Sequence, residues 1–397
     1  MLMGQLGYRA PAPDEEARAL ALSGFGQPGQ LQTPRPLFYI PAAVLNEKPL
    51  ISYSGMVPHS PLGLASIAAT DLRGRPAWFL ISPTWSIEED GAPEQLRILA
   101  IVHRHRNPNH RLIFVCNTPG EADKMQGCGE AAFFYNKTAS TSERTFRPLD
   151  GAAPAFDAIY NALLAPWKRH HLSLEIPTCA FLFYRDDVSE GSASAEARIM
   201  ACHTAVPRHV FINPLDKDQR PIRLTLSEVN RHLNRASVGL CLSEKEGAMF
   251  ASTEYLLSGL PIVTTPSIGG RHVYHDEEYC RTVPPDPRSV ADAVRALKDR
   301  DIPRAYIRGR TLRRLECDRA RFMTLINTIL EECGAARRLA GPWPFRKDVT
   351  MEWLPPSQAL ARVVYEIVDG FGKPKRGLMR WRKWKHALGL TRSYDAG

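Results

Sequence analysis

Short apolar runs alternate with longer mixed segments along most of this chain. In the first half, a segment with apolar residues at helical spacing (95–103) lies among four such runs, at 37–40, 51–53, 78–81 and 112–116. In the second half the runs lie at 156–162, 179–184, 209–213, 238–242 and 262–265, and the segments around them predict helices near 170–175, 194–203, 226–235, 250–258 and 288–299. Strands that alternate with helices predict parallel sheets covered by helices, an α/β fold.

The length of the chain and the breaks in this pattern predict several parts. At 397 residues the chain is too long for one average core and fits two domains of roughly 150 to 200 residues each. We expect a mobile leader over 1–36 with a short helix at 15–23, and a first domain over 37–150. A second domain is expected over 151–345, and a tail over 346–397 that opens with a helix at 357–368.

Composition narrows the class of protein. Hydrophobic residues make up 44% and charged residues 23%, as in ordinary soluble proteins. The eight cysteines show neither metal-ligand nor paired spacing, which favours a reducing compartment. We find no secretory signal and no apolar run of about 18 residues, so we expect a cytoplasmic protein. The net charge of +9 indicates an anionic partner.

The most informative stretch is 235–270. A buried strand at 238–242 is followed by the polar loop 243–247 and then by a predicted helix, whose first N–H groups attract phosphate. On one continuous helix Glu246 and Glu254 would stand roughly 12 Å apart. One carboxylate could then accept hydrogen bonds from a sugar and the other from a ribose diol, with a diphosphate between them. Gly247 would let the backbone approach such a ligand closely.

This stretch resembles the donor-binding core of the retaining GT-B glycosyltransferases of family 4, the group 1 type. The family pattern reads S-x-x-E-G-F-G, then E-A-x-A-x-G-x-P-V-V, then a Gly-Gly loop. The matching residues are Ser243, Glu246, Gly247, Glu254, Gly259, Pro261, Gly269 and Gly270. Ala248 and Met249 stand where the family has Phe-Gly.

Neighbouring segments extend the resemblance over about 145–330. Residues 157–170 resemble the first donor-domain strand and its G-R-x-x-x-x-K-G loop, so that Lys168 falls on the lysine that contacts the donor diphosphate. Leu163 replaces the usual arginine, and Arg169 and His170 are candidates to compensate. The alternative is that Lys168 and Arg169 are only surface charges. Residues 146–148 resemble the F-x-P that ends the acceptor domain, and 283–286 resemble the closing V-P-P-x-D segment.

The resemblance implies a GT-B fold, in which two Rossmann-like domains face each other across a cleft and a C-terminal helix crosses back. It implies a retaining hexosyltransferase that moves a sugar from a nucleoside diphosphate sugar to a hydroxyl group of a glycan or lipid-linked acceptor. Lys168 and Glu246 would be catalytic, and the donor would be bound by Arg169, Ser243, Gly247, Ala248, Met249, Glu254 and Gly269. We find no D-x-D motif and expect neither a metal nor a cofactor.

The first domain offers weaker candidates. Gly55 opens the glycine-containing loop 55–63, and Asn117 and Glu121 follow the strand 112–116, which makes all three acceptor-side candidates. A plain loop or turn is the alternative for each of them. His103, His105 and His110 suggest a metal or a base, but a solvated helix end is the interpretation that we favour.

The segment 373–392 is dense in lysine and arginine, with Trp381 and Trp384 interleaved. It could form an amphipathic helix on an anionic membrane surface, which would make the protein peripheral to the inner face of a membrane. It could also pack back on the first domain, and nucleic-acid binding is the least favoured interpretation.

Other functions fit the same fold. A non-catalytic sugar- or partner-binding protein on a GT-B scaffold is the main alternative, supported by Leu163. An epimerase or a phosphorylase is a third possibility.

Overall fold

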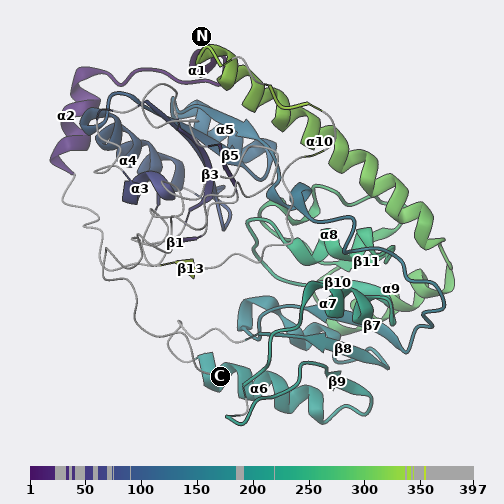
Figure 1. The fold of residues 1–397 in the computed structure, drawn as a ribbon. Coiled ribbons are helices and arrows are strands. Elements are labelled where there is room, and N and C mark those ends of the chain that lie inside the picture. The colour runs from purple at the N-terminus through teal and green to yellow at the C-terminus, as the bar shows by residue number, and fades with distance from the viewer. Residues whose placement is uncertain are drawn as a thin grey trace. The chain divides into compact units, whose positions relative to one another are not determined.

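A computed structural model divides the chain into two units, each built around its own sheet (Figure 1). It describes residues 1–22, 33–34, 38–40, 50–56, 61–68, 74, 76–89, 91–184, 192–218, 220–335, 338–340, 343 and 353–354. Unit 1 comprises Met1–Tyr135 together with the residues from Ala320 onward, and unit 2 comprises Asn136–Arg319. Among the described residues, no helix combines the length and the apolarity needed to cross a bilayer.

The sheet of unit 1 has the order β2-β3-β4-β5-β6, in which β2 is antiparallel and the other strands are parallel. Its strands are β2 (Phe38–Ile40), β3 (Leu50–Gly55), β4 (Ala77–Ser82), β5 (His110–Cys116) and β6 (Ala132–Phe134). All six residues of β4 are buried, as expected where helices cover both faces of a parallel sheet. The accompanying helices are α3 (Leu64–Ala68), α4 (Ala92–Arg106) and α5 (Pro119–Gly127). A further strand pair joins β1 (Thr33–Pro34) to β13 (Trp353–Leu354).

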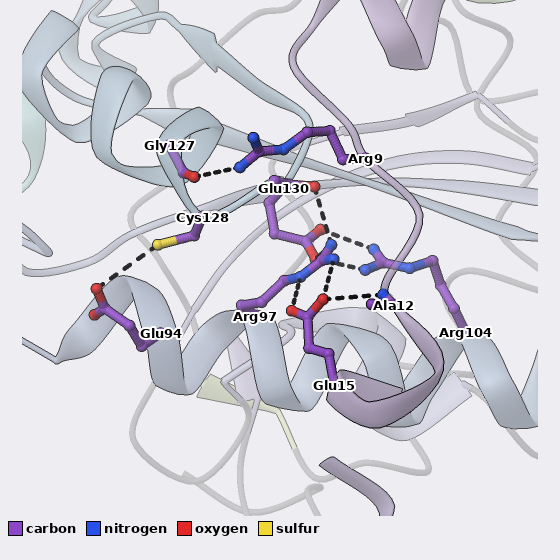
Figure 2. A network of polar contacts seen from close by, with 10 residues as sticks. Arg9, Ala12, Glu15, Glu94, Arg97, Arg104, Gly127, Cys128 and Glu130 are labelled. Atoms are coloured by element: carbon purple, nitrogen blue, oxygen red, sulfur yellow. Dashed lines mark hydrogen bonds and ion pairs between the residues drawn. The ribbon is translucent and has the colours of Figure 1, made fainter. Parts of the chain in front are cut away.

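The first 22 residues pack on unit 1, whereas the sequence predicted a mobile leader. They form α1 (Leu2–Gln5) and α2 (Pro13–Ala21), and α2 opens with Pro13 followed by three acidic residues, a favourable helix start. Arg97 of α4 donates to Glu15 of α2 and to the fully buried Glu130, which also accepts from Arg104 (Figure 2). These ion pairs and the α2–α4 packing hold the segment on unit 1.

Unit 2 has a six-stranded parallel sheet with the order β12-β11-β10-β7-β8-β9. Its strands are β7 (Phe156–Asn161), β8 (Cys179–Leu182), β9 (His209–Phe211), β10 (Ala236–Cys241), β11 (Ile262–Thr264) and β12 (Cys280–Thr282). This is the doubly wound order of nucleotide-binding domains. Five of the strands confirm the sequence-based prediction, and β12 is additional.

The helices of unit 2 are α6 (Ser192–Thr204), α7 (Leu226–Leu233), α8 (Phe250–Leu257) and α9 (Pro287–Asp299), with short 3-10 turns η1 (Lys137–Ser140), η2 (Pro166–Lys168), η3 (His170–Ser173) and η4 (Gly270–His272). The expected helix near 170–175 is therefore a 3-10 turn. In the V-P-P-x-D segment, Asp286 caps α9 by accepting from the Ser289 N–H at 2.9 Å.

The helix α10 (Arg304–Glu332), 29 residues long, was not predicted from the sequence. The residues up to Arg319 belong to unit 2 and those from Ala320 belong to unit 1. The first boundary between the units lies at 135/136 rather than at 150/151, so Phe146-Arg147-Pro148 lies inside unit 2. The helix expected at 357–368 lies outside the described residues.

Candidate functional site

The chain reverses its direction of winding between β7 and β10, which are neighbours in the second sheet. In doubly wound folds, ligands bind in the crevice at the carboxyl ends of the strands at this point. Three segments meet there in unit 2, namely 162–169 after β7, 242–249 after β10 and 265–271 after β11. They contain nearly all the donor-side residues that the sequence indicated.

Backbone hydrogen bonds hold these three segments side by side beyond the ends of the strands. The Glu244 N–H donates to the Trp167 carbonyl at 3.1 Å, and the Ile268 N–H donates to the Glu244 carbonyl at 3.1 Å. The Glu246 N–H donates to the Ile268 carbonyl at 3.0 Å. The polar loop after β10 is therefore a short extension of the sheet, with fixed side-chain directions.

Lys168 and Glu246 form an ion pair at this point, although 78 positions separate them in the sequence. The Lys168 ammonium donates to Glu246 Oε1, and the Ser243 hydroxyl donates to the same oxygen at 2.6 Å. The two charged side chains are 12% and 13% exposed, so that each is largely packed but still reachable. In the described chain, Lys168 uses one of its three donors and Glu246 Oε2 has no hydrogen-bond partner.

Arg169 occupies a left-handed backbone conformation, with φ 50° and ψ 46°, where the resembling family has glycine. Its side chain fixes this turn. The Nε atom donates to the Leu242 carbonyl at 2.7 Å, and Nη2 donates to Thr265 Oγ1 at 2.9 Å and to the Pro266 carbonyl at 3.1 Å. No acceptor within the described ranges binds Nη1, which keeps its donors available for an anion.

His170, the other candidate to compensate for Leu163, is buried and uncharged. Its ring packs against that of Tyr160 in a tilted arrangement, at a centroid distance of 4.8 Å and an interplanar angle of 42°. Burial, helped by the charges of His203 and Lys168, lowers the pKa of His170 to about 3. A neutral ring without access to solvent cannot neutralise phosphate, so Arg169 is the candidate that the geometry supports.

The helix after β10 begins at Phe250, where the sequence pattern predicted it, so that Glu246 is not part of the helix. Its first residue is Phe250 and its N-cap is Met249, which supplies no side-chain cap. Glu246 therefore lies in the loop and Glu254 in the second turn of α8, and the spacing estimated for one continuous helix does not apply. Glu254 is 9% exposed and accepts a hydrogen bond from the Asn161 side chain at the end of β7, at 3.3 Å.

The glycines of the site shape its backbone. The Gly270 N–H donates to the Gly247 carbonyl at 2.8 Å, which joins the loops after β10 and β11. Gly269 has φ 99°, a conformation that side chains disfavour. Of the two residues at the Phe-Gly position of the family pattern, Met249 is buried and Ala248 is partly exposed.

Comparison with known proteins shows that this chain resembles solved structures in its fold. No family model matches the chain, and no curated protein does. Among solved structures, sucrose-phosphate synthase from Thermosynechococcus elongatus is 15% identical, and the match covers 71% of this chain and 74% of that chain with a TM-score of 0.50. The chain has a GT-B fold.

Two other matches are looser. Anabaena HepE in complex with UDP and glucose is 12% identical over 66% of this chain and 80% of that one, with a TM-score of 0.45. The C-terminal domain of LpcC, a group 1 glycosyl transferase of Francisella tularensis, is 13% identical over 50% of this chain and 100% of that one, with a TM-score of 0.33. At these identities the likeness concerns the fold and not the roles of individual residues.

Arg271 is a residue of the candidate site that the sequence analysis missed. It is 2% exposed and donates through Nη1 to the Ser243 carbonyl at 2.6 Å and to Ser243 Oγ at 3.1 Å. Its place directly after Gly269-Gly270 was the available signal. Asn161, which contacts Glu254, was also missed, and its place at the end of β7 was the signal.

The acceptor-side candidates lie in unit 1. Asn117 and Glu121 are fully buried. The Glu121 carboxylate accepts from the backbone N–H groups of Ile87 at 3.2 Å and Asn117 at 2.7 Å, so it joins two loops at the carboxyl end of the sheet. Gly55 ends β3, and residues 57–60 of its loop lie outside the described residues. A role for these three residues in binding an acceptor stays a prediction.

Of the three histidines of α4 and β5, only His105 lies at a solvated helix end. His103 and His110 are buried and share a hydrogen bond of 2.9 Å between Nε2 and Nδ1. Burial lowers the pKa of His103 to about 3, so this ring is neutral. His105 is exposed and contacts Glu16 at 2.8 Å. Within the described ranges, no three His, Cys, Asp or Glu side chains are grouped so as to hold a metal ion.

A cavity of about 450 Å³ in unit 2 is unrelated to this site. It is lined by residues such as Phe156, Thr178 and Lys298, which lie at or near the amino ends of the strands and on α9. In doubly wound folds, ligands bind at the opposite edge, where the carboxyl ends of the strands lie.

Proposed function

We propose that this protein is a glycosyltransferase that moves a sugar from a nucleoside diphosphate sugar to a hydroxyl acceptor. The observation that carries the proposal is the Lys168–Glu246 pair at the winding reversal of the second sheet. An ammonium suits the diphosphate of such a donor, and a carboxylate suits its sugar hydroxyls. The likeness of fold to sucrose-phosphate synthase supports the scaffold.

Positive groups would stabilise the leaving diphosphate. When the bond between the anomeric carbon and the phosphate oxygen breaks, the diphosphate gains negative charge. The remaining donors of the Lys168 ammonium and Nη1 of Arg169 would receive it. The start of α8 at Phe250 adds the positive end of a helix dipole. Such preorganised charges are a main source of rate acceleration, because they need no rearrangement during the reaction.

Acidic groups would orient the donor. Oε1 of Glu246 is engaged by Lys168 and Ser243, which leaves Oε2 to accept a hydrogen bond from the sugar. Glu254, held near the end of β7 by Asn161, would accept from the ribose diol. The acceptor oxygen then forms the new bond to the anomeric carbon and releases its proton, while the nucleoside diphosphate departs.

Several finer features belong to the same proposal. Retention at the anomeric carbon and the transfer of a hexose are inferred from the resemblance of the sequence to the glycosyltransferase family. Because Lys168 and Arg169 supply the neutralising charge, we propose that neither a metal nor a cofactor takes part. The acceptor would be a glycan or a lipid-linked hydroxyl in glycan synthesis. We also propose that the segment 373–392, which lies outside the described residues, contacts an anionic membrane surface.

A second function is favoured by one observation. Leu163 stands where the resembling family has an arginine, so the site could bind a nucleotide sugar without transferring the sugar. Turnover distinguishes the two functions, because a binding protein is stabilised by nucleotide sugar but releases no nucleoside diphosphate from it.

The experiment compares wild type with Lys168→Ala and Glu254→Ala by thermal unfolding and calorimetry against nucleoside diphosphates and their sugars. A ligand at a hundred times its Kd stabilises the wild type by about 2.7 kcal/mol. Loss of the Lys168 charge should weaken binding about tenfold to a hundredfold. In a release assay, it should lower kcat by about a hundredfold or more.

The matched control is Lys298→Ala. Lys298 also pairs with a carboxylate, that of Asp157 at 2.6 Å, but at the amino ends of the strands. This variant should bind nucleotides as the wild type does. Unchanged affinity in both Lys168→Ala and Glu254→Ala would remove the donor site from this part of unit 2.

A further inference from the structure

Arg271 joins the two loops that carry the donor site. Its Nη1 donates to the carbonyl and the hydroxyl of Ser243 after β10, and its Nη2 donates to the Thr265 carbonyl after β11. Its Nε has no hydrogen-bond partner within the described chain although it is buried. A buried N–H without a partner is unfavourable for stability, and such departures concentrate at functional sites.

The chemistry of arginine fixes the direction of the hydrogen bonds around Ser243. A guanidinium can only donate, and it keeps its proton in proteins even though burial lowers the pKa of Arg271. Ser243 Oγ therefore accepts from Arg271 at 3.1 Å. The single hydroxyl proton of Ser243 is left for Glu246 Oε1, at 2.6 Å.

Because the Ser243 hydroxyl donates to Glu246, it determines which oxygen of that carboxylate stays free. Oε1 receives the Ser243 hydroxyl in addition to the Lys168 ammonium, so both of its bonding directions are occupied. The carboxylate cannot rotate without losing one of these bonds. Oε2 is therefore held as a free acceptor, within reach of solvent through a side chain that is 13% exposed.

We propose that Arg271 is a positioning residue that acts through Ser243 to orient the Glu246 carboxylate toward the donor sugar. This role rests on the proposed glycosyltransferase function. Arg271 does not touch the donor in this arrangement. It acts on the part of the affinity that the sugar contributes, because the diphosphate is held by Lys168, Arg169 and the start of α8.

The test is calorimetry with matched pairs of probes: UDP and UDP-glucose, ADP and ADP-glucose, GDP and GDP-mannose. For the pair that binds wild type, Arg271→Met should weaken the nucleotide sugar about tenfold and leave the nucleoside diphosphate within about twofold. Ser243→Ala should do the same. The double variant should lose no more than Ser243→Ala alone, because both residues act through one bond.

Two further variants separate positioning from general stability. Arg304→Met removes another guanidinium that donates to backbone carbonyls, those of Ala236 and Ser258, at the far end of β10. It should lower the thermal stability and leave the ratio of the two affinities unchanged. Arg271→Lys, which retains a donor, should recover part of the ratio. Should Arg271→Met fail to fold, Ser243→Ala and Arg271→Lys carry the same comparison.

The outcomes distinguish the two proposals. If wild type binds none of the probes, the donor site itself is wrong and the role of Arg271 falls with it. If wild type prefers the nucleotide sugar and the Arg271 and Ser243 variants keep that preference, only the positioning role is overturned. An equal loss of affinity for both members of a pair would also overturn it.

Discussion

At the residue scale, His170 couples the stability of unit 2 to pH. The ring is 1% exposed, and neither of its nitrogens finds a partner among the described residues. Its pKa is lowered to about 3 by burial, whereas an unfolded histidine titrates near 6.5. Between these values the unfolded chain binds a proton that the folded chain does not. Stability is therefore full above about pH 6.5 and decreases as the pH falls below it.

We predict that His170→Phe makes the protein less sensitive to acid. Between pH 7 and pH 5 the titration of His170 alone should lower the free energy of unfolding by about 2 kcal/mol. Because phenylalanine takes no proton, the variant should lose about 2 kcal/mol less than wild type over this interval. Urea unfolding at both pH values measures the difference. Parallel losses in the two proteins would show that the ring is already charged or exposed when folded.

At the element scale, the position of α8 depends on its close approach to β10. Gly239 of β10 faces Tyr255 of α8, and a Cβ atom at Gly239 would lie 2.5 Å from the tyrosine ring. The Tyr255 hydroxyl also accepts from the Asn161 N–H at 2.6 Å, which ties α8 to the end of β7. Because Glu254 precedes Tyr255, the packing of this helix sets the place of a site carboxylate.

We predict that Gly239→Ala destabilises the protein by about 1–3 kcal/mol, as overpacking of a filled core does. It should also weaken nucleotide binding, because α8 must move away from β10. The control is Gly309→Ala in α10, where the nearest atom would lie 3.9 Å from the new Cβ. That change should stabilise the helix by about 1 kcal/mol. Urea unfolding and calorimetry on the two variants check both effects, and a neutral Gly239→Ala would refute this packing.

At the scale of the whole molecule, each of the two units is stabilised by its own network of ion pairs and hydrogen bonds. In unit 1, Arg97 donates to Glu130 at 2.9 Å and to Glu15 at 2.9 Å, and the Glu130 side chain is fully buried. In unit 2, the donor-side residues depend on contacts within that unit. Damage to the first network should therefore reduce stability without changing the nucleotide site.

We predict that Arg97→Met lowers the free energy of unfolding by about 2–3 kcal/mol, because the buried Glu130 loses one of its two arginine partners and keeps only Arg104. Affinity for nucleotides should stay within about twofold of wild type under conditions where the variant is folded. Arg295→Met is the control, since its pairing with Asp292 is exposed and should change stability by less than about 0.5 kcal/mol. If the two variants are equally stable, the network does not hold unit 1.

The sequence best predicted those elements that depend on a local pattern of apolar and polar residues. The apolar runs predicted the central strands of both sheets, because strands buried on both faces must be apolar. The edge strand β12 was missed, since two of its three residues are exposed. The helix α10 was missed because its arginines resemble a solvated face, yet Arg308 and Arg319 donate to backbone carbonyls.

For the candidate site, motif order indicated Lys168, Glu246 and Glu254 one by one. Their arrangement could not be predicted, because it depends on which strands become neighbours. The start of α8 at Phe250 was predicted, but the estimate that placed Glu246 on the same helix was wrong, since the Glu244–Ile268 and Glu246–Ile268 backbone bonds hold the loop in an extended form. The place of Arg271 after Gly269-Gly270 was visible in the sequence, but its contacts with Ser243 depend on which loops become neighbours.

The order of strands in unit 2 also determines when, during translation, the residues of the candidate site can come together. The ribosome releases Lys168 well before Glu246, and the central neighbours β7 and β10 are far apart in the nascent chain. Non-local strand pairing of this kind is a slow step. A chain still short of β10 therefore leaves one edge of β7 unpaired and cannot form the Lys168–Glu246 ion pair. Because an unpaired strand edge is prone to aggregate, the pairing of β7 with β10 also protects the growing chain.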